Sequence, residues 1–223
     1  MDKPFLSEVI EKLRMVLPHG KEIALHEPCF SGNEWNYIRQ CLDTGWVSSV
    51  GQYVKSFEEQ LAEYIGVKYA VALVNGTAAL HLSLILAGVG PGDEVLVPAL
   101  SFVATANAVA YCGATPHFVD SEEVTLGMDP CKLEIYLNDI ARADSGSCIN
   151  RLTGRPIKAV IPVHTFGHPA DLDPLAEVCS IFHLELIEDA TESLGSRYKG
   201  RPTGSRGRMA VLSFNGNKIV TTG

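Results

Sequence analysis

The chain lacks the features that would direct it to a membrane, a secretory route or a nucleic acid. Its longest apolar run, Ala78 to Val89, is interrupted by His81 and Ser83 and is too short to span a bilayer. No charged-then-apolar signal opens the sequence. Lys and Arg number 18 against 26 Asp and Glu, which gives a net charge of −8, and no basic stripe is visible. We therefore expect neither a membrane nor a nucleic-acid partner.

Cysteine is present but is not arranged for cross-linking or for metal binding. The six cysteines are scattered and none has C-x-x-C spacing: Cys29, Cys41, Cys112, Cys131, Cys148 and Cys179. This pattern predicts reduced thiols, no disulfide framework and no metal site. We accordingly expect the protein in the cytoplasm.

The apolar pattern predicts helices first and then strands that alternate with helices. Helical spacing covers 5–17, 33–43 and 54–65. Strands are then predicted at 69–74, 94–97, 115–119, 157–162, 184–187 and 210–214, and helices at 77–87, 102–111, 130–140 and 172–182. The segment 142–156 is polar and is predicted to be irregular, at the edge of the sheet. Apolar strands separated by helices indicate an α/β fold, with a mainly parallel sheet sandwiched by helices.

Several polar side chains follow the predicted strands, where ligands collect in parallel sheets. They are Asn75-Gly76-Thr77, Ser101-Phe102, His164, Asp189, Ser213 and Lys218. A lysine amine near apolar walls loses its proton more easily and can form a Schiff base with an aldehyde. Amides at the start of the helix after Asn75 suit a phosphate, and a carboxylate such as Asp189 favours a protonated pyridine. The combination predicts pyridoxal 5′-phosphate as cofactor.

Each of these residues also has a purely structural interpretation. Asn75 or Thr77 is a possible helix N-cap, and Asp189 a possible cap or member of a buried ion pair. Lys218 and Glu192 are possible surface residues, Ser213 can bond to the local backbone, and Phe102 is a possible core residue. His164 can equally be a satisfied structural histidine.

The residues of the motifs and their order along the chain identify a protein family more specifically than any single residue does. From about Leu25 to Gly223 the chain resembles the DegT/DnrJ/StrS family of sugar aminotransferases, which are pyridoxal phosphate enzymes of fold type I, the aspartate-aminotransferase fold. The matching stretches include Gly45-Trp46-Val47-Ser48-Ser49, Val74-Asn75-Gly76-Thr77-Ala78-Ala79-Leu80, Pro91-Gly92-Asp93-Glu94-Val95, Phe102-Val103-Ala104-Thr105-Ala106-Asn107, Pro162-Val163-His164, Glu188-Asp189-Ala190 and Ser213 through Lys218 to Gly223.

The resemblance implies roles for ten residues. Lys218 bonds the cofactor aldehyde and moves the proton, Asp189 pairs with the pyridine nitrogen, Phe102 stacks on the ring, and Thr77, Ala78 and Ser213 hold the phosphate. Glu192 stands where relatives often have Gln or His and contacts the ring hydroxyl. Trp46 and Ser48 line the substrate end, with His164 nearby.

The implied reaction moves an amino group from L-glutamate to a nucleotide-linked 4-keto-6-deoxy sugar, for cell-surface polysaccharide or nonulosonic-acid biosynthesis, in a homodimer. The segment 142–156 is similar to the branch that serves legionaminic-type sugars. Relatives that act as sugar dehydratases carry His in place of the lysine, and Lys218 argues against that alternative.

Family members continue well beyond the lysine. We therefore expect an N-terminal helical segment at 1–30 and a cofactor-binding large domain at 31–223 that is incomplete at its C-terminal end, with the small C-terminal domain absent. A truncated non-catalytic remnant and one half of a split enzyme are the alternatives to an active enzyme.

Overall fold

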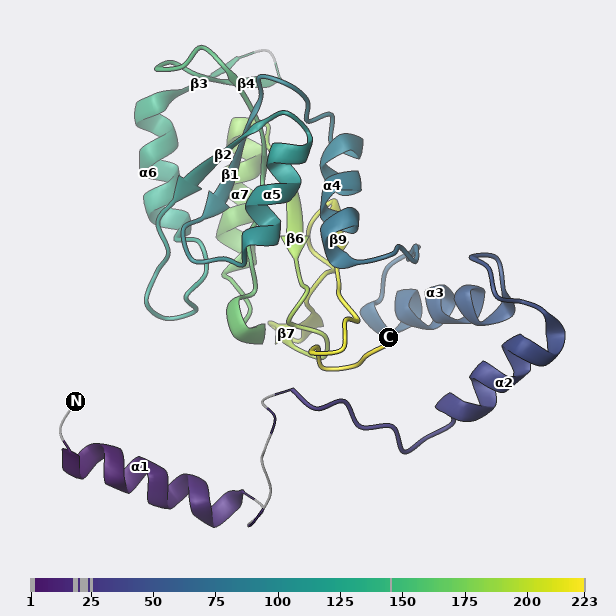
Figure 1. Ribbon diagram of the computed structural model, residues 1–223. Coiled ribbons are helices and arrows are strands. Elements are labelled where there is room, and N and C mark those ends of the chain that lie inside the picture. Colours follow the sequence, from purple (N-terminus) through teal and green to yellow (C-terminus); the bar gives the residue numbers. More distant parts are fainter. Residues whose placement is uncertain (1–2, 18–19, 21–23, 25, 145, 223) are drawn as a thin grey trace.

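A mainly parallel sheet forms the centre of the molecule in the computed structural model, which describes residues 3–17, 20, 24, 26–144 and 146–222. Its parallel strands lie in the order β2 (Thr115–Val119), β1 (Glu94–Pro98), β5 (Pro156–Val160), β6 (Glu185–Asp189) and β9 (Met209–Val211) (Figure 1). The predicted α/β class is confirmed.

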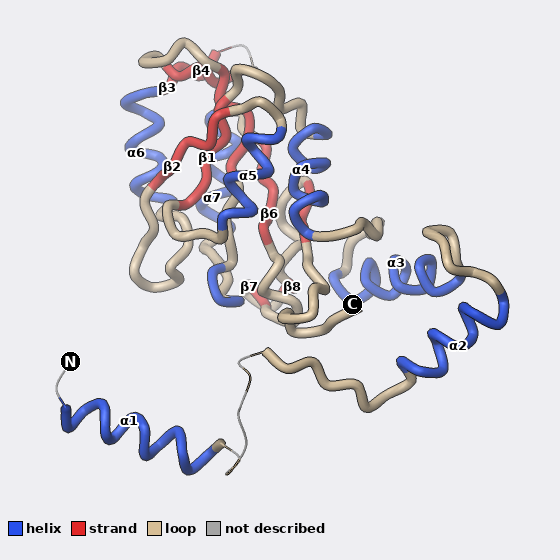
Figure 2. Tube along the Cα trace, in the orientation of Figure 1, coloured by secondary structure: helices blue, strands red, loops and turns tan. Residues whose placement is uncertain are grey.

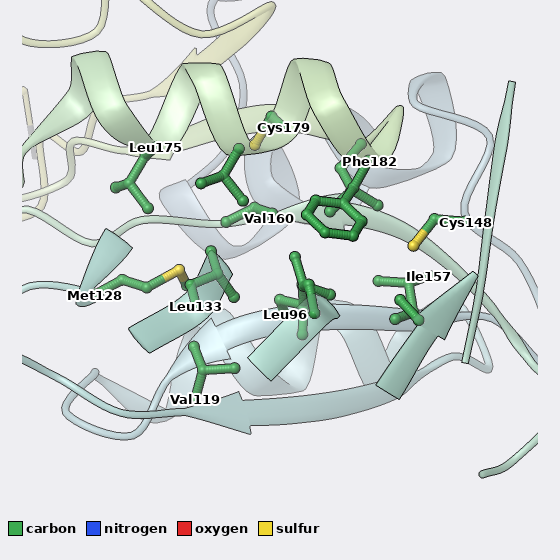
Figure 3. Packing of buried hydrophobic residues seen from close by; sticks show 14 of the residues in the cluster. Leu96, Val119, Met128, Leu133, Cys148, Ile157, Val160, Leu175, Cys179 and Phe182 are labelled. Atoms are coloured by element: carbon green, nitrogen blue, oxygen red, sulfur yellow. The ribbon is translucent and has the colours of Figure 1, made fainter. Parts of the chain in front are cut away.

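Helices cover both faces of this sheet (Figure 2). They are α6 (Pro130–Ile140) and α7 (Leu172–Phe182) on one face, and α4 (Gly76–Leu86) and α5 (Val103–Tyr111) on the other. Side chains of β1 alternate between the two layers, because successive strand residues point to opposite faces. Leu96 joins the cluster with α6 and α7, whereas Val95 and Val97 join the cluster with α4 and α5. Figure 3 shows Leu175, Cys179 and Phe182 of α7 above the strand residues Leu96 and Val160.

Three further helices precede the sheet. They are α1 (Lys3–Val16), α2 (Glu34–Thr44) and α3 (Gln52–Ile65), close to the predicted spans. α3 ends at Gly66, whose φ of +78° is the left-handed conformation common after a helix. α1 and α2 lie to one side of the sheet (Figure 1). Their apolar side chains, such as Val16 and Trp35, are exposed.

The strand predicted at 69–74 is wrong. These residues form neither helix nor strand and carry no strand pairing within the described part of the chain, and Tyr69, Val71 and Val74 are exposed. The amide of Ala72 donates instead to Oε1 of Glu58 in α3, at 2.7 Å. An apolar, β-branched run specifies an extended backbone, but a strand also needs a neighbour to accept its hydrogen bonds.

The irregular segment predicted at 142–156 is wrong for 142–144 and 147–150 and correct for 151–155, and its place at the sheet edge is confirmed. It contains an antiparallel hairpin of β3 (Ala141–Asp144) and β4 (Ser147–Asn150), and β4 pairs with the start of β5. Gly146 takes a φ of +82° in the turn. The polar composition of the segment led to the wrong prediction, because edge strands tolerate polar side chains on an exposed face.

Smaller elements complete the description. β9 ends at Val211, three residues before the predicted end, and a short hairpin of β7 (Arg197–Tyr198) and β8 (Arg201–Pro202) precedes it. A 3-10 turn, η1, covers Thr165–Gly167. Among helices within the described residues, none is both long and apolar enough to cross a bilayer. The division at residue 30 stays a prediction, and parts of 1–30, as well as Gly223, lie outside the described residues.

Candidate active site

The start of α4 lies against two loops that follow other strands. Asn75 is the N-cap, and its side chain accepts a hydrogen bond from the amide of Ala78 at 2.8 Å. A Cβ at Gly76 would lie 3.3 Å from Cγ2 of Thr191 and 3.4 Å from Cβ of Ser213. A side chain at position 76 would therefore press on Thr191, and glycine lets the backbone of α4 approach both loops without that strain. The helix start, Thr191 and Ser213 form one cradle, although the Ala78 amide is already engaged by the cap.

Asp189, the last residue of β6, is buried and held from both sides. Its Oδ2 accepts a hydrogen bond from the hydroxyl of Thr105 in α5, at 2.8 Å. Its Oδ1 accepts from the Thr191 hydroxyl at 2.8 Å and from the Thr191 amide at 3.3 Å. The hydroxyl of Ser101 in turn donates to Thr105 Oγ1 at 2.8 Å, which adds a third member to this series of hydrogen bonds. The carboxylate is thus fixed in orientation at the carboxyl end of the sheet.

Lys218 lies in the loop that follows β9. Its side chain is largely covered, with 17% exposed, and its Nζ donates to Oε1 of Glu192. The loop is closed at its base, because the Thr222 amide donates to the carbonyl of Phe214 at 3.0 Å. Phe214 itself packs edge-on against Phe57 of α3 with ring centroids 4.9 Å apart. The structure thus brings Lys218 and Glu192 together beside the Asp189 loop.

Phe102 precedes α5 and is 75% exposed. Phe102 stands three residues before Thr105, whose hydroxyl donates to Asp189. An exposed ring at this place excludes the core interpretation of Phe102. The ring is available to stack on a flat ligand.

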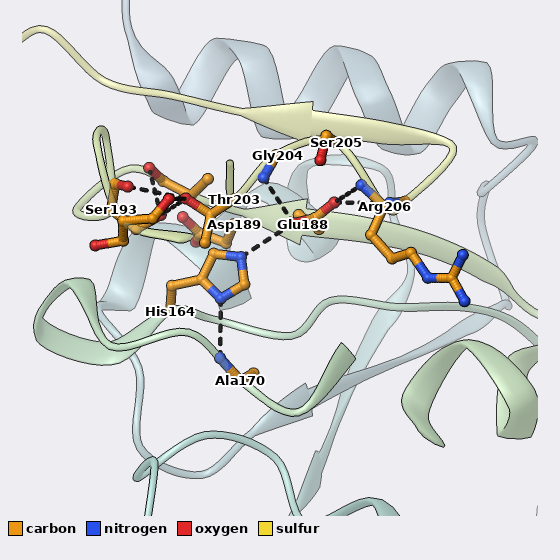
Figure 4. A network of polar contacts seen from close by, with 12 residues as sticks. His164, Ala170, Glu188, Asp189, Ser193, Thr203, Gly204, Ser205 and Arg206 are labelled. Atoms are coloured by element: carbon orange, nitrogen blue, oxygen red, sulfur yellow. Dashed lines mark hydrogen bonds and ion pairs between the residues drawn. The ribbon is translucent and has the colours of Figure 1, made fainter. Parts of the chain in front are cut away.

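The ring of His164 is turned toward Glu188 of β6, as Figure 4 shows. The ring is fully buried, its Nδ1 accepts from the amide of Ala170 at 3.1 Å, and its Nε2 contacts Glu188 Oε2 at 3.1 Å. Burial raises the pKa of Glu188, but hydrogen bonds from His164 and from the Gly207 and Gly204 amides outweigh it and hold this pKa below its ordinary value. Both ring nitrogens of His164 therefore contact protein groups. This arrangement agrees with a histidine whose role is structural.

Trp46 and Ser48 line a different hollow, between α2 and α3. It has a volume of about 240 Å³ and is also lined by Cys41, Thr44 and Tyr53. This hollow lies at the start of α3, whereas the end of α3 leads on to Asn75 and α4. The structure does not place either residue beside Lys218.

The residues around Asp189 fit a ligand that carries a phosphate and a pyridine ring. The Gly76 cradle has a hydroxyl from Ser213 beside the amino end of α4, where the helix dipole favours an anion. The buried carboxylate of Asp189, the exposed ring of Phe102 and the amine of Lys218 provide the remaining contacts.

Thr105 and Thr191 are the site residues that sequence reasoning did not assign. Thr191 follows Asp189 by two positions, a spacing typical of a local side-chain turn, and this signal could have identified it. Thr105 stands 84 residues from Asp189, and no local pattern links the two.

Comparisons with known proteins agree with this geometry. The DegT/DnrJ/EryC1/StrS aminotransferase family matches residues 28–223. GDP-perosamine synthase of Caulobacter vibrioides is 46% identical over 201 residues, which cover 90% of this chain and 50% of that protein. EpsN of Bacillus subtilis, named as a putative pyridoxal phosphate-dependent aminotransferase, is 45% identical over 202 residues, 91% of this chain and 50% of EpsN. The chain spans about half the length of the curated relatives it matches.

Solved structures show the same fold. The 3-amino-5-hydroxybenzoic acid synthase structure has a TM-score of 0.76 at 31% identity, over 90% of this chain and 48% of that one. DesV of S. venezuelae, in complex with a ketimine intermediate, has a TM-score of 0.72 at 32% identity, over 97% of this chain and 49% of that one. The fold is that of the fold type I aminotransferases, as predicted.

Proposed function

Because the chain belongs to the DegT/DnrJ/EryC1/StrS aminotransferase family, we propose that the whole protein transfers an amino group from L-glutamate to a nucleotide-linked 4-keto-6-deoxy sugar. The proposed cofactor is pyridoxal 5′-phosphate, and the proposed setting is the biosynthesis of a cell-surface polysaccharide or a nonulosonic acid. The observation that carries the proposal is the group formed by buried Asp189, the Gly76 cradle and Lys218. Similarity to GDP-perosamine synthases supports the sugar substrate.

In this proposal Asp189 acts through contacts that it already makes, whereas Ala78 and Glu192 exchange a present partner for the cofactor. The cofactor, when bound, supplies an aldehyde and an electron-withdrawing ring. Asp189, held by Thr105 and Thr191, keeps the pyridine nitrogen protonated. Thr77, Ala78 and the Ser213 hydroxyl would hold the phosphate, with the Ala78 amide released from the Asn75 cap, and Phe102 would cover one face of the ring.

Lys218 is the proposed catalytic residue. Its amine would bond the aldehyde of the cofactor, and its Nζ would hold and release the proton that is moved. Glu192, now in contact with Lys218 Nζ, is proposed to turn to the ring hydroxyl once the lysine is engaged. The side chain of Glu192 is 43% exposed, so it is not locked in place by packing on all sides.

The substrate contacts and the assembly are finer proposals. Trp46 and Ser48 are proposed to reach the sugar nucleotide in a homodimer, which would explain why their hollow lies apart from Lys218 in one chain. The exposed apolar side chains of α1 and α2 support such an assembly. The free thiols of all six cysteines support a cytoplasmic setting.

A second candidate function is suggested by the share of the relatives that is matched, since these 223 residues span about half of their length. In this alternative the chain is non-catalytic by itself, or is one half of a split enzyme that binds cofactor or partner without turnover. A sugar dehydratase is the less supported alternative, because Lys218 stands where those relatives have His.

The first test is cofactor attachment. Purified chain is incubated with pyridoxal 5′-phosphate, reduced with borohydride and mapped by peptide mass spectrometry. We expect one phosphopyridoxyl group, on Lys218, and an absorbance band that Lys218→Ala abolishes. Lys199→Ala is the matched control and should keep the band, because Lys199 pairs with Asp173 outside the candidate site.

The outcomes separate the candidates. Labelling spread over surface lysines, equal in Lys218→Ala, contradicts the proposed cofactor site. Specific labelling without amino transfer from L-glutamate to a keto-sugar nucleotide supports the non-catalytic alternative for these residues by themselves.

A further inference from the structure

The hairpin β7–β8 and the turn after it carry an unusual concentration of positive charge. Residues 197–208 contain five of the 18 Lys and Arg of a chain whose net charge is −8, and they contain no Asp or Glu. The five are Arg197, Lys199, Arg201, Arg206 and Arg208. Such a concentration creates a local positive potential that attracts anions.

Three of these cations line one hollow between the hairpin and the start of α7. Its volume is about 340 Å³, and its lining includes Lys199, Arg201, Ser205 and Arg206, with Asp173 as the acidic residue. Lys199 Nζ lies 2.8 Å from Asp173 Oδ2, and Arg206 Nε lies 3.3 Å from Asp173 Oδ1. Within the described chain, Arg201 has no carboxylate partner.

The turn that carries Arg206 is anchored from below (Figure 4). The buried carboxylate of Glu188 accepts hydrogen bonds from the amides of Gly204, Arg206 and Gly207, each at 2.7 Å. The backbone of the turn is therefore fixed, while the Arg206 side chain points away from Glu188. A rigid support lowers the entropy lost when a ligand is bound.

We propose that this hollow, formed by Lys199, Arg201, Ser205 and Arg206, binds the phosphate group of a small phosphorylated metabolite. Three cations and one carboxylate leave two positive charges, which match a phosphate monoester of charge about −2. Asp171, which accepts from the Tyr198 hydroxyl, is not among the lining residues, so it is left out of this charge count. Arg201 and Arg206 supply the planar donors that suit phosphate oxygens.

This hollow is separate from the candidate active site. It shares no lining residue with the Gly76 cradle or with the contacts of Asp189 and Lys218. Glu188 and Asp189 are neighbours in β6, so their side chains point to opposite faces of the sheet. The phosphate of the metabolite and that of a cofactor would bind on opposite sides of β6.

The test is a titration of the chain with inorganic phosphate, followed by backbone amide shifts in NMR at constant ionic strength. We expect saturable shifts in residues 199–206. Arg201→Gln should weaken the apparent affinity about tenfold, the effect of losing a hydrogen bond to a charged group. Arg208→Gln is the matched control, because it removes the same charge from the same segment but pairs with Glu185 outside the hollow.

A second control addresses phosphate at the candidate active site. Ser213→Ala should leave the shifts at 199–206 unchanged. The proposal is overturned if phosphate shifts only residues near Gly76 in a Ser213-dependent manner. Equal weakening by Arg201→Gln and Arg208→Gln also overturns it, since that result indicates a diffuse basic surface suited to an anionic polymer. Thermal unfolding of each variant checks that it is folded.

Discussion

At the scale of single residues, the orientation of Asp189 depends on two hydroxyl groups. Thr105 and Thr191 each donate to a different carboxylate oxygen at 2.8 Å. A buried carboxylate retains its position only while its acceptor sites are satisfied, because an unpaired buried charge is costly. Thr105 therefore contributes to the candidate site without any need to touch a ligand.

Thr105→Val should lower the free energy of unfolding by about 1 to 2 kcal/mol, since it removes a buried donor to a charged group with little change of shape. Urea denaturation measures this difference. Thr115→Val is the control, because Thr115 is exposed and accepts only from Arg155, and a change within about 0.5 kcal/mol is expected there. Equal losses in both variants would show that the Asp189 contact is not the source.

At the scale of secondary-structure elements, Glu188 near the end of β6 holds two neighbouring loops in place through hydrogen bonds. Glu188 binds the turn 204–207 through three backbone amides and contacts His164, which in turn accepts from the Ala170 amide. One buried carboxylate thus joins β6, the loop after β5 and the turn before β9. Asp189, the next residue, is positioned by the same arrangement.

Glu188→Ala should lower the free energy of unfolding by about 3 kcal/mol or more, because it leaves several buried donors without an acceptor. Hydrogen exchange should also rise first in residues 204–207, whose amides lose their partner. Glu185→Ala, in the same strand, removes an acid whose pair with Arg208 is partly exposed, and a loss below about 1 kcal/mol is expected. Unchanged hydrogen exchange in 204–207 would show that Glu188 does not hold this turn in place.

At the scale of the whole molecule, buried acids lie in both halves of the sheet. Glu94 at the start of β1 accepts from Asn150 at 2.8 Å and from Thr153 at 2.6 Å. Burial raises the pKa of Glu94, but the hydrogen bonds from Thr153, Asn150 and His117 together lower it below the ordinary 4.5. The pKa of Glu188 is lowered in the same direction. Ionised carboxylates therefore stabilise the fold.

Stability should accordingly be complete above about pH 4.5 and should fall as the pH drops through the lowered pKa values of Glu94 and Glu188. Urea midpoints measured between pH 7 and pH 3 report this loss. Glu188→Gln cannot titrate, so its midpoint should be lower at pH 7 but should decline less on acidification. A decline as steep as that of the unaltered chain would exclude Glu188 as a source.

The sequence by itself determined the layers of this protein and the residues placed at the ends of its strands. The spacing of apolar residues is a local property, and it is sufficient to predict the helices α4 to α7 and the parallel strands between them, but not the short hairpins β3–β4 and β7–β8. The motifs around Gly76, Asp189 and Lys218 indicated the family for the same reason, since each is a short run of neighbours.

Only the tertiary structure decided which distant groups meet. Thr105 reaches Asp189 across 84 residues, His164 turns to Glu188, and the apolar run 69–74 has no strand partner within the described chain. The hollow of Trp46 and Ser48 lies apart from Lys218 although both carry family motifs. Hydrogen-bond partners and strand pairing depend on how elements pack, and no local pattern of residues records that geometry.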